Sequence, residues 1–282
     1  MKFHLDTAEI YIPDNEPEEQ ALARTTHLCL AAHQDDIEIM AAQPIIECFQ
    51  QKDKWFTGVV VTDGRGSPRN SIYENYSDDE MRLVRFKEQR KAAIVGEFAA
   101  QIMLDIPSKV IKDAARAEPV EDLLAILRAT KPKVVYTHNF ADKHDTHVGV
   151  ALRVIEALRR LSPAERPERV VGCEVWRALD WMVDSDKLTM DLTRHENLQA
   201  ALLGVFDSQI VGGKRYDLAS MGRRRANATY FESHGVDDAQ GISFGVDMTP
   251  LMNDASMTPA DFVGGFIQRF VKDVNERIRR MS

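Results

Sequence analysis

The sequence predicts an α/β fold, a Rossmann-like and mostly parallel sheet flanked by helices, with a C-terminal helical elaboration. Between residue 26 and about residue 176, apolar runs of strand length alternate with segments of helical period. This alternation is typical of βαβ units with right-handed crossovers. After residue 176 it fades and helical patterns dominate. No internal repeat or low-complexity linker divides the chain.

Five apolar runs have the length of buried strands, and they cover residues 26–32, 57–62, 101–106, 133–138 and 169–176. Four helices are expected between them, beginning near Pro44, Ser77, Pro119 and His147. Ser77 and Glu80 form a capping-box pair. Because a proline is tolerated in the first turn of a helix, the first helix is placed at Pro44. Residues 34–43 are then expected to form a loop.

Three further helices are expected in the second half of the chain. Residues 194–209 and 216–231 each fit one helix, and a capping signal at Thr258 and Asp261 precedes a long amphipathic stripe. Gly264 and Gly265 weaken that last helix by about 1 kcal/mol each, so close packing is expected there. We expect an N-terminal extension packed on the domain (1–25), the main α/β domain (26–240) and a C-terminal extension ending in the amphipathic helix (241–282).

Composition excludes several classes of protein. The net charge of −8 argues against a nucleic-acid binder, which is usually basic. No apolar run approaches the roughly 20 residues that span a bilayer, and the N-terminus does not resemble a signal peptide. Three scattered cysteines without a pairing pattern fit a reducing compartment. A cytoplasmic protein is therefore expected.

Two short motifs carry metal-ligand side chains. They are Ala32-His33-Gln34-Asp35-Asp36 and His144-Asp145-Thr146-His147, and each lies where a predicted strand gives way to a loop. In an open parallel sheet such segments meet in one crevice at the carboxyl ends of the strands. Imidazole and carboxylate groups suit a catalytic zinc site with three protein ligands. Without cysteine ligands the site also accepts Fe²⁺ or Mn²⁺.

This set of side chains is sufficient for hydrolysis. Two imidazoles and one carboxylate can bind the metal, which lowers the pKa of a water molecule towards roughly 7. The second carboxylate can accept the proton of that water, and the remaining imidazole can stabilise an oxyanion. A metal hydrolase is the function that this inventory favours.

The two motifs, in this order and followed by Thr62-Asp63-Gly64-Arg65-Gly66, resemble the PIG-L-type (LmbE-like) zinc-dependent de-N-acetylases. The resemblance covers about residues 25–160. It implies that His33, Asp36 and His147 bind zinc, that Asp35 is the general base, and that His144 stabilises the tetrahedral intermediate. It also implies an amino-sugar or glycoconjugate substrate.

Arg85 approximately matches an arginine with which that family holds substrate. Arg65 is a second candidate, because arginines near the motifs and in the run 223–225 could grip an anionic group or simply form a solvated face. His138 ends a predicted strand and could be structural or functional. The family's carboxylate between the two histidines is replaced by Thr146 in this chain.

The predicted reaction is removal of an N-acetyl or similar acyl group from an amino sugar. One alternative is hydrolysis of another C–N bond in a non-sugar substrate, and another is a non-catalytic sugar-binding protein. In place of the missing carboxylate, Asp142 or Asp145 could orient the catalytic histidine. The C-terminal amphipathic helix is interpreted as core packing or as a contact within a homo-oligomer, because its polar face carries both signs of charge.

Overall fold

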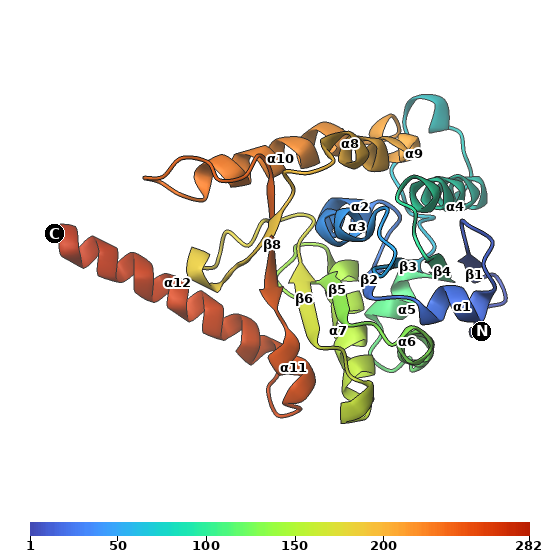
Figure 1. The fold of residues 1–282 in the computed structure, drawn as a ribbon, viewed down its shortest axis with the longest axis horizontal. Coiled ribbons are helices and arrows are strands. Elements are labelled where there is room, and N and C mark those ends of the chain that lie inside the picture. The colour runs from blue at the N-terminus through green and yellow to red at the C-terminus, as the bar shows by residue number, and fades with distance from the viewer.

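The computed structural model describes all 282 residues, which build one eight-stranded sheet in the order β1-β4-β3-β2-β5-β6-β8-β7 (Figure 1). Strands β2 to β6 run parallel, whereas β1, β8 and β7 pair antiparallel. The strand bounds are β1 (Glu9–Tyr11), β2 (His27–Ala31), β3 (Phe56–Thr62), β4 (Ala100–Ile106), β5 (Val134–His138), β6 (Arg169–Cys173), β7 (Leu188–Asp191) and β8 (Ile242–Asp247). The predicted α/β class and its five parallel strands are confirmed.

Helices cover both faces of this sheet (Figure 1). One layer contains α1 (Glu18–Ala23), α5 (Ser108–Lys112), α6 (Glu118–Thr130), α7 (Asp145–Arg159) and α11 (Thr249–Asn253). The opposite layer contains α2 (Asp36–Met40), α3 (Ala42–Cys48), α4 (Asp78–Val95), α8 (Glu196–Gly204), α9 (Asp207–Ile210) and α10 (Tyr216–Tyr230). The last helix, α12 (Pro259–Met281), projects away from the body.

The buried strands separate the core into two halves. Along β2, Leu28 and Leu30 pack into the layer of α6 and α7, whereas Cys29 and Ala31 pack into the layer of α2 and α3. This follows from the two-residue period of a strand, which sends successive side chains to opposite faces. Because both faces are covered, the strands are apolar throughout, as expected for a parallel sheet.

The expected loop at residues 34–43 is wrong, because α2 begins at Asp36 and α3 at Ala42. Every residue of α2 is buried, so the helix shows no alternation of polar and apolar faces in the sequence. The single helix expected over 194–209 is also wrong. It breaks near Phe206, and the second piece, α9, starts where the backbone N–H of Ser208 donates to the buried carboxylate of Glu88 at 2.7 Å.

The order of the strands determines where a site can form. From β2 the chain builds the sheet outwards through β3 and β4, and it then crosses to the other side of β2 to add β5 and β6. The direction therefore reverses between β2 and β5, and their carboxyl ends leave a crevice there. The two motifs found in the sequence follow these two strands.

The C-terminal helix begins as expected, with the Thr258 side chain accepting a hydrogen bond from the backbone N–H of Asp261 at 3.1 Å. The close packing expected at Gly264 and Gly265 is absent. A side chain at Gly264 would meet no atom within 4 Å, and one at Gly265 would meet only the flexible end of Arg269. None of the helices combines the length and the apolar character that a bilayer crossing requires.

Candidate metal centre

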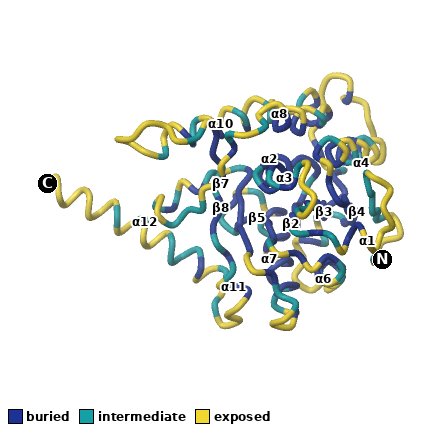
Figure 2. The backbone as a smooth tube through the Cα atoms, viewed as in Figure 1, coloured by how far each residue is buried: buried dark blue, intermediate teal, exposed yellow.

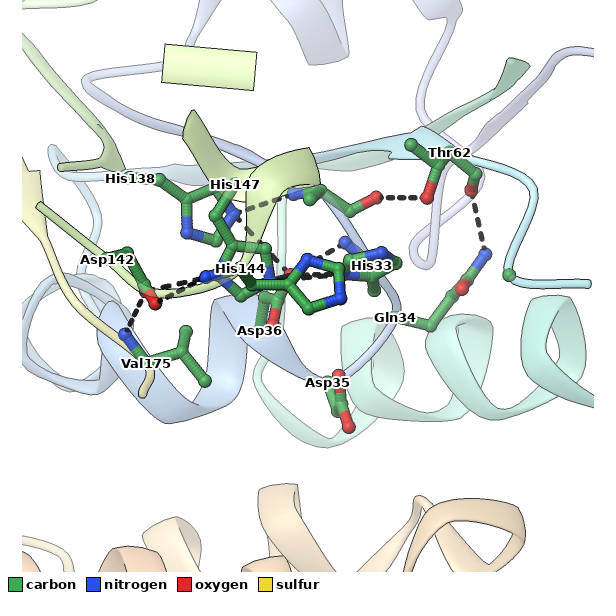
Figure 3. A network of polar contacts seen from close by, with 12 residues as sticks. His33, Gln34, Asp35, Asp36, Thr62, His138, Asp142, His144, His147 and Val175 are labelled. Atoms are coloured by element: carbon green, nitrogen blue, oxygen red, sulfur yellow. Dashed lines mark hydrogen bonds and ion pairs between the residues drawn. The ribbon is translucent and has the colours of Figure 1, made fainter. Parts of the chain in front are cut away.

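The first motif forms a tight turn between β2 and α2. Its backbone is fixed by the N–H of His33, which donates to Asp36 Oδ2 at 2.7 Å. Asp35 has a φ of 102°, a left-handed conformation that costs a non-glycine residue on the order of 1–3 kcal/mol. This turn lets His33 and Asp36 face the same point while Asp35 lies apart from them (Figure 3).

The second motif begins α7, with His144 at the position before the helix and His147 in its first turn. His147 is fixed by Asp142, because its Nδ1 lies 3.1 Å from Asp142 Oδ2. The same oxygen accepts the backbone N–H of Val175 at 3.0 Å, which ties the loop after β6 to the site. With Nδ1–H donating to Asp142, Nε2 of His147 presents its lone pair to the crevice.

Three potential ligand atoms converge at the centre of the crevice (Figure 3). His33 Nδ1 lies 3.1 Å from Asp36 Oδ2 and 3.2 Å from His147 Nε2, and His147 Nε2 lies 3.3 Å from Asp36 Oδ2. Ligands about 2.1 Å from a tetrahedral ion stand roughly 3.4 Å apart. The three atoms predicted from the sequence therefore fit one metal ion.

His138 belongs to an alternative set of potential ligands, with Asp36 and His147. Its Nε2, however, accepts the backbone N–H of Ala32 at 2.8 Å, so the lone pair needed for a metal is already occupied. The ring is fully buried and stacks on His147, with 4.0 Å between ring centroids. His138 therefore supports the site from behind, and its predicted contact with substrate does not fit the structure.

The charges of the site favour a cation at its centre. Burial alone would raise the pKa of Asp36, but His147, His138 and His33 hold it well below the usual range. Burial alone would lower the pKa of His147, but Asp36 and Asp142 raise it to about 10. Between two ionised carboxylates the metal-free protein thus stabilises a proton, and a metal ion can take over that positive charge.

Asp35 has a different environment from Asp36. Burial raises the pKa of Asp35 to about 8, against the opposing effect of Arg85, whose Nη2 lies 3.5 Å from Asp35 Oδ1. Arg85 is in turn held by the Ser67 hydroxyl and the Gln34 carbonyl. A side chain at Gly64 would lie 3.0 Å from the Arg85 chain, so glycine is needed to let the guanidinium pass. A carboxylate with such a pKa suits proton transfer near neutral pH.

His144 lies beside the convergent ligands without a fixed partner for its ring. Its Nδ1 is buried and forms no hydrogen bond, and Asp142 contacts only the backbone N–H of His144, at 3.4 Å. Burial, together with His33 and His147, lowers the pKa of His144 and favours the neutral ring. The Asp142 side chain therefore orients His147, and no carboxylate orients His144.

An open cavity of about 460 Å³ lies in front of these side chains. Its lining is mostly polar, and it comprises His33, Asp35, Asp36, Ile39, Gly64, Gly66, Ser67, Pro68, Arg85, Ser108, Lys112, His144, Thr146, His147, Val175, Trp176, Gln209, Lys214 and Tyr216. Of the three predicted substrate-binding residues, the lining includes Arg85 but neither His138 nor Arg65. Arg65 instead pairs with Asp79 and Asp63 at the surface.

Sequence reasoning missed the far wall of the cavity. Lys214 Nζ lies 4.5 Å from the ring centroid of Trp176, and that ring is nearly parallel to His144, at 12° and 6.5 Å. Tyr216 packs edge-on against Trp176. Trp176 directly follows a predicted strand, a position that could have suggested a role, whereas Lys214 and Tyr216 carry no signal in the sequence.

The arginines 223–225 on α10 do not face the cavity. Arg223 donates to the carbonyls of Val175 and Arg177, so it holds the loop that carries Trp176. Arg224 is buried and donates to the Glu38 carbonyl at 2.7 Å, at the end of α2. Arg225 is exposed and pairs with a glutamate of α8, Glu196. The run therefore connects α10 to the two segments that shape the site.

Comparison with known proteins agrees with this geometry. Residues 28–158 match the family model described as PIG-L, GlcNAc-PI de-N-acetylase. In the solved structures the fold is similar to that of N,N'-diacetylchitobiose deacetylase from Pyrococcus horikoshii, with 18% identity, coverage of 82% of this chain and 88% of the other, and a TM-score of 0.59. The conserved protein TT1542 from Thermus thermophilus gives 18% identity, 79% and 94% coverage, and a TM-score of 0.59.

The fold is also similar to that of a protein named for a different reaction. GalB, the 4-carboxy-2-hydroxymuconate hydratase of Pseudomonas putida KT2440, is 13% identical, with coverage of 78% of this chain and 95% of the other, and a TM-score of 0.56. At such identities the similarity establishes the fold alone. The reaction has to be argued from the side chains of the site.

Proposed function

Because residues 28–158 form a PIG-L-family domain, we propose that this protein is a zinc-dependent hydrolase that removes an N-acetyl or similar acyl group from an amino sugar or glycoconjugate. The observation that carries the proposal is the convergence of His33 Nδ1, Asp36 Oδ2 and His147 Nε2 within 3.3 Å of one another. A carboxylate outside this set, Asp35, faces the same cavity.

His33, Asp36 and His147 would hold the metal. A bound zinc ion supplies a Lewis acid and makes water acidic enough to act as a nucleophile near neutral pH. The histidine and carboxylate donors also accept Fe²⁺ or Mn²⁺. Asp142, through Nδ1 of His147, would keep that ring in the orientation that metal binding requires.

Asp35 would act as the general base. Its carboxylate accepts a proton from the attacking water, whose oxygen forms a bond to the acyl carbon. The C–N bond then breaks, and the proton held by Asp35 passes to the nitrogen of the leaving amine. The water is thus divided between the two products, a carboxylic acid and a free amino group.

His144 would stabilise the oxyanion that forms on the acyl oxygen. A neutral imidazole can donate one N–H to it, and the lowered pKa of His144 favours that form. Arg85, which is held by Ser67 and Gln34, would position the substrate from the opposite side of Asp35. The polar lining of the cavity fits a substrate rich in hydroxyl groups.

The test is an assay of the metal-loaded protein with N-acetylglucosamine and its glycosides, in which acetate and free amine are both measured. Replacing Asp35→Asn is expected to lower turnover by about 10²–10⁴-fold while metal stays bound. Asp63→Asn is a matched control, because Asp63 is also a buried carboxylate that follows a strand but does not line the cavity.

Three results would contradict the proposal. Full activity of Asp35→Asn would remove the assigned base, and failure of the protein to bind any transition metal would remove the site. Hydrolysis of non-sugar amides alone would identify a different C–N hydrolase, and saturable sugar binding without product would identify a non-catalytic binding protein.

A further inference from the structure

The C-terminal helix α12 leaves an apolar stripe uncovered (Figure 2). Only Phe262, near its start, is buried. Beyond it, five apolar side chains are exposed by between 38% and 82%, namely Ile267, Val271, Val274, Ile278 and Met281. Contiguous exposed apolar surface of this kind marks an interaction site in a soluble protein.

The spacing of these side chains specifies the kind of contact. Successive members are four, three, four and three residues apart, which is the a/d spacing of a coiled coil. Residues 267–281 rise along about 21 Å of helix axis. A helix that repeats every 3.5 residues keeps this seam on one side, where a second helix can pack against it.

The charges next to the seam point to a particular partner. The loop 180–187 lies beside the first half of the exposed stripe, since Trp181 packs on Phe266 and Asp186 pairs with Arg269 at 2.6 Å. This loop is acidic, and Asp180 in it has no ion-pair partner. At the other end of the helix, Arg279 and Arg280 have no carboxylate within ion-pair distance. The two unpaired charges of opposite sign are too far apart along the helix to meet within one chain.

We propose that α12 is a dimerisation helix, which packs antiparallel against α12 of a second copy of this chain, with the two-fold axis near Val274. In that arrangement residues 279 and 280 of one copy lie opposite residues 269 and 268 of the other. The free arginines of each copy thereby reach the acidic loop 180–187 of its partner. The contact is isologous and closes on itself, as in most dimers.

A groove between the helix and this loop provides further contact surface. Its volume is about 730 Å³, and its wall includes Met182, Val183 and Phe270 together with the seam residues Val274 and Ile278. A seam of only two heptads is short for a coiled coil. The groove and the acidic loop therefore have to contribute, and a dissociation constant in the micromolar range is expected.

The polar face of α12 argues against a lipid surface as the partner. Lys272 pairs with Glu276 at 3.8 Å and Arg277 with Asp273 at 3.0 Å, so both signs of charge alternate along it. A helix that binds an anionic membrane carries mainly Lys and Arg on that face. The proposal goes beyond the proposed function and does not depend on it.

The first test is the oligomeric state of the full chain, measured by sedimentation over a range of concentrations. The wild-type protein is expected to be a dimer that dissociates on dilution, and Val271→Lys and Ile278→Lys are expected to be monomers at every concentration. Leu83→Lys is the matched control, since Leu83 is an equally exposed apolar side chain on α4, at 61%. It should leave the dimer intact.

Cysteine cross-linking then determines the orientation. Val274→Cys lies on the proposed axis and should form an intermolecular disulfide under mild oxidation, because all three native cysteines are buried. Ile267→Cys and Met281→Cys should cross-link as a mixture of the two variants and not each with itself. Cross-linking of each variant with itself would show a parallel pair and overturn the proposed arrangement.

Two further outcomes would overturn the dimer itself. One is a wild-type protein that stays monomeric through the micromolar range. The other is a monomer that binds anionic lipid vesicles through α12, with binding lost in Ile278→Lys.

Discussion

The metal centre and α12 deviate from an ordinary soluble protein in opposite ways. The centre buries polar groups, because Asp36, His138, Asp142 and His147 are all at most 5% exposed. Helix α12 exposes apolar groups, because Val271 and its neighbours along the seam face solvent. Buried polar and exposed apolar groups both carry a cost, so each has to be explained by a partner or a task.

The two regions differ in where those partners are. At the metal centre the partners are within the chain. Asp142 Oδ2 alone joins His147 to the loop after β6, through contacts of 3.1 Å and 3.0 Å. On α12 no segment of the chain covers the seam, so the partner must come from outside. The comparison teaches that a fully satisfied polar cluster is a finished site, whereas an unsatisfied apolar stripe is half of an interface.

The largest effect is expected from Asp36→Ala. It removes the oxygen that faces His33 and His147, so the bound metal should fall from about one per chain to nearly none. Metal content after dialysis, measured by mass spectrometry, checks this. Asp142→Asn should weaken metal binding only by about 10–100-fold, because Asp142 acts through His147. If Asp36→Ala retained its metal, the buried polar groups would be structural.

A smaller effect is expected from Arg224→Met. Burial lowers the pKa of Arg224 to about 10, and the side chain donates to the Gln199 amide oxygen at 3.1 Å and to the Glu38 carbonyl at 2.7 Å. Its loss leaves these buried acceptors unpaired and should cost about 1–3 kcal/mol in urea unfolding. Arg225→Met is the control, because exposed ion pairs are worth less than about 1 kcal/mol. Equal losses in both variants would mean that Arg224 does not hold α2.

The pH dependence of stability gives a further test at Glu38. Burial raises the pKa of this carboxyl to about 8, against a usual value of 4.5. Between these values the unfolded chain releases a proton that the folded chain keeps, so the stability of the fold decreases as the pH rises from about 5 to 8. Glu38→Gln removes this loss. The variant should gain on the order of 1–2 kcal/mol over the wild type at pH 8 and little at pH 5.

The smallest effect is expected on α12. Val271→Gln should change the free energy of unfolding of the dilute monomer by less than about 0.5 kcal/mol, because the side chain is 51% exposed and no buried contact is lost. Urea titration at low protein concentration checks this, since dimer formation would add its own stabilisation. A loss of several kcal/mol would show that the seam packs within one chain and would erase the contrast between the two regions.

The sequence predicted those parts of the molecule in which local pattern and structure agree. Strands β2 to β6 were found because their side chains are apolar on both faces, and the capping signals at Ser77 and Thr258 begin helices as expected. Helix α2 was missed because a helix that is buried on all sides has no periodic pattern. The split between α8 and α9 depends on Glu88, a contact 120 residues away in the chain.

The candidate site divides in the same way. The convergence of His33, Asp36 and His147 followed from two motifs at the ends of neighbouring strands. The task of His138 could not be predicted, because it depends on which nitrogen meets the backbone N–H of Ala32. The far wall, with Trp176 and Lys214, comes from segments that lie outside any motif and are brought in by tertiary packing alone.

That far wall has an evolutionary consequence. All proposed metal ligands lie between residues 33 and 147, whereas the opposing surface is contributed by residues 175–216 through loops and α9. Insertions or substitutions in this later segment can alter which molecule fits against Trp176 and Tyr216 without moving a single ligand. The architecture thus keeps the reactive machinery and the selectivity on separate stretches of gene, so that one can diversify while the other is inherited unchanged.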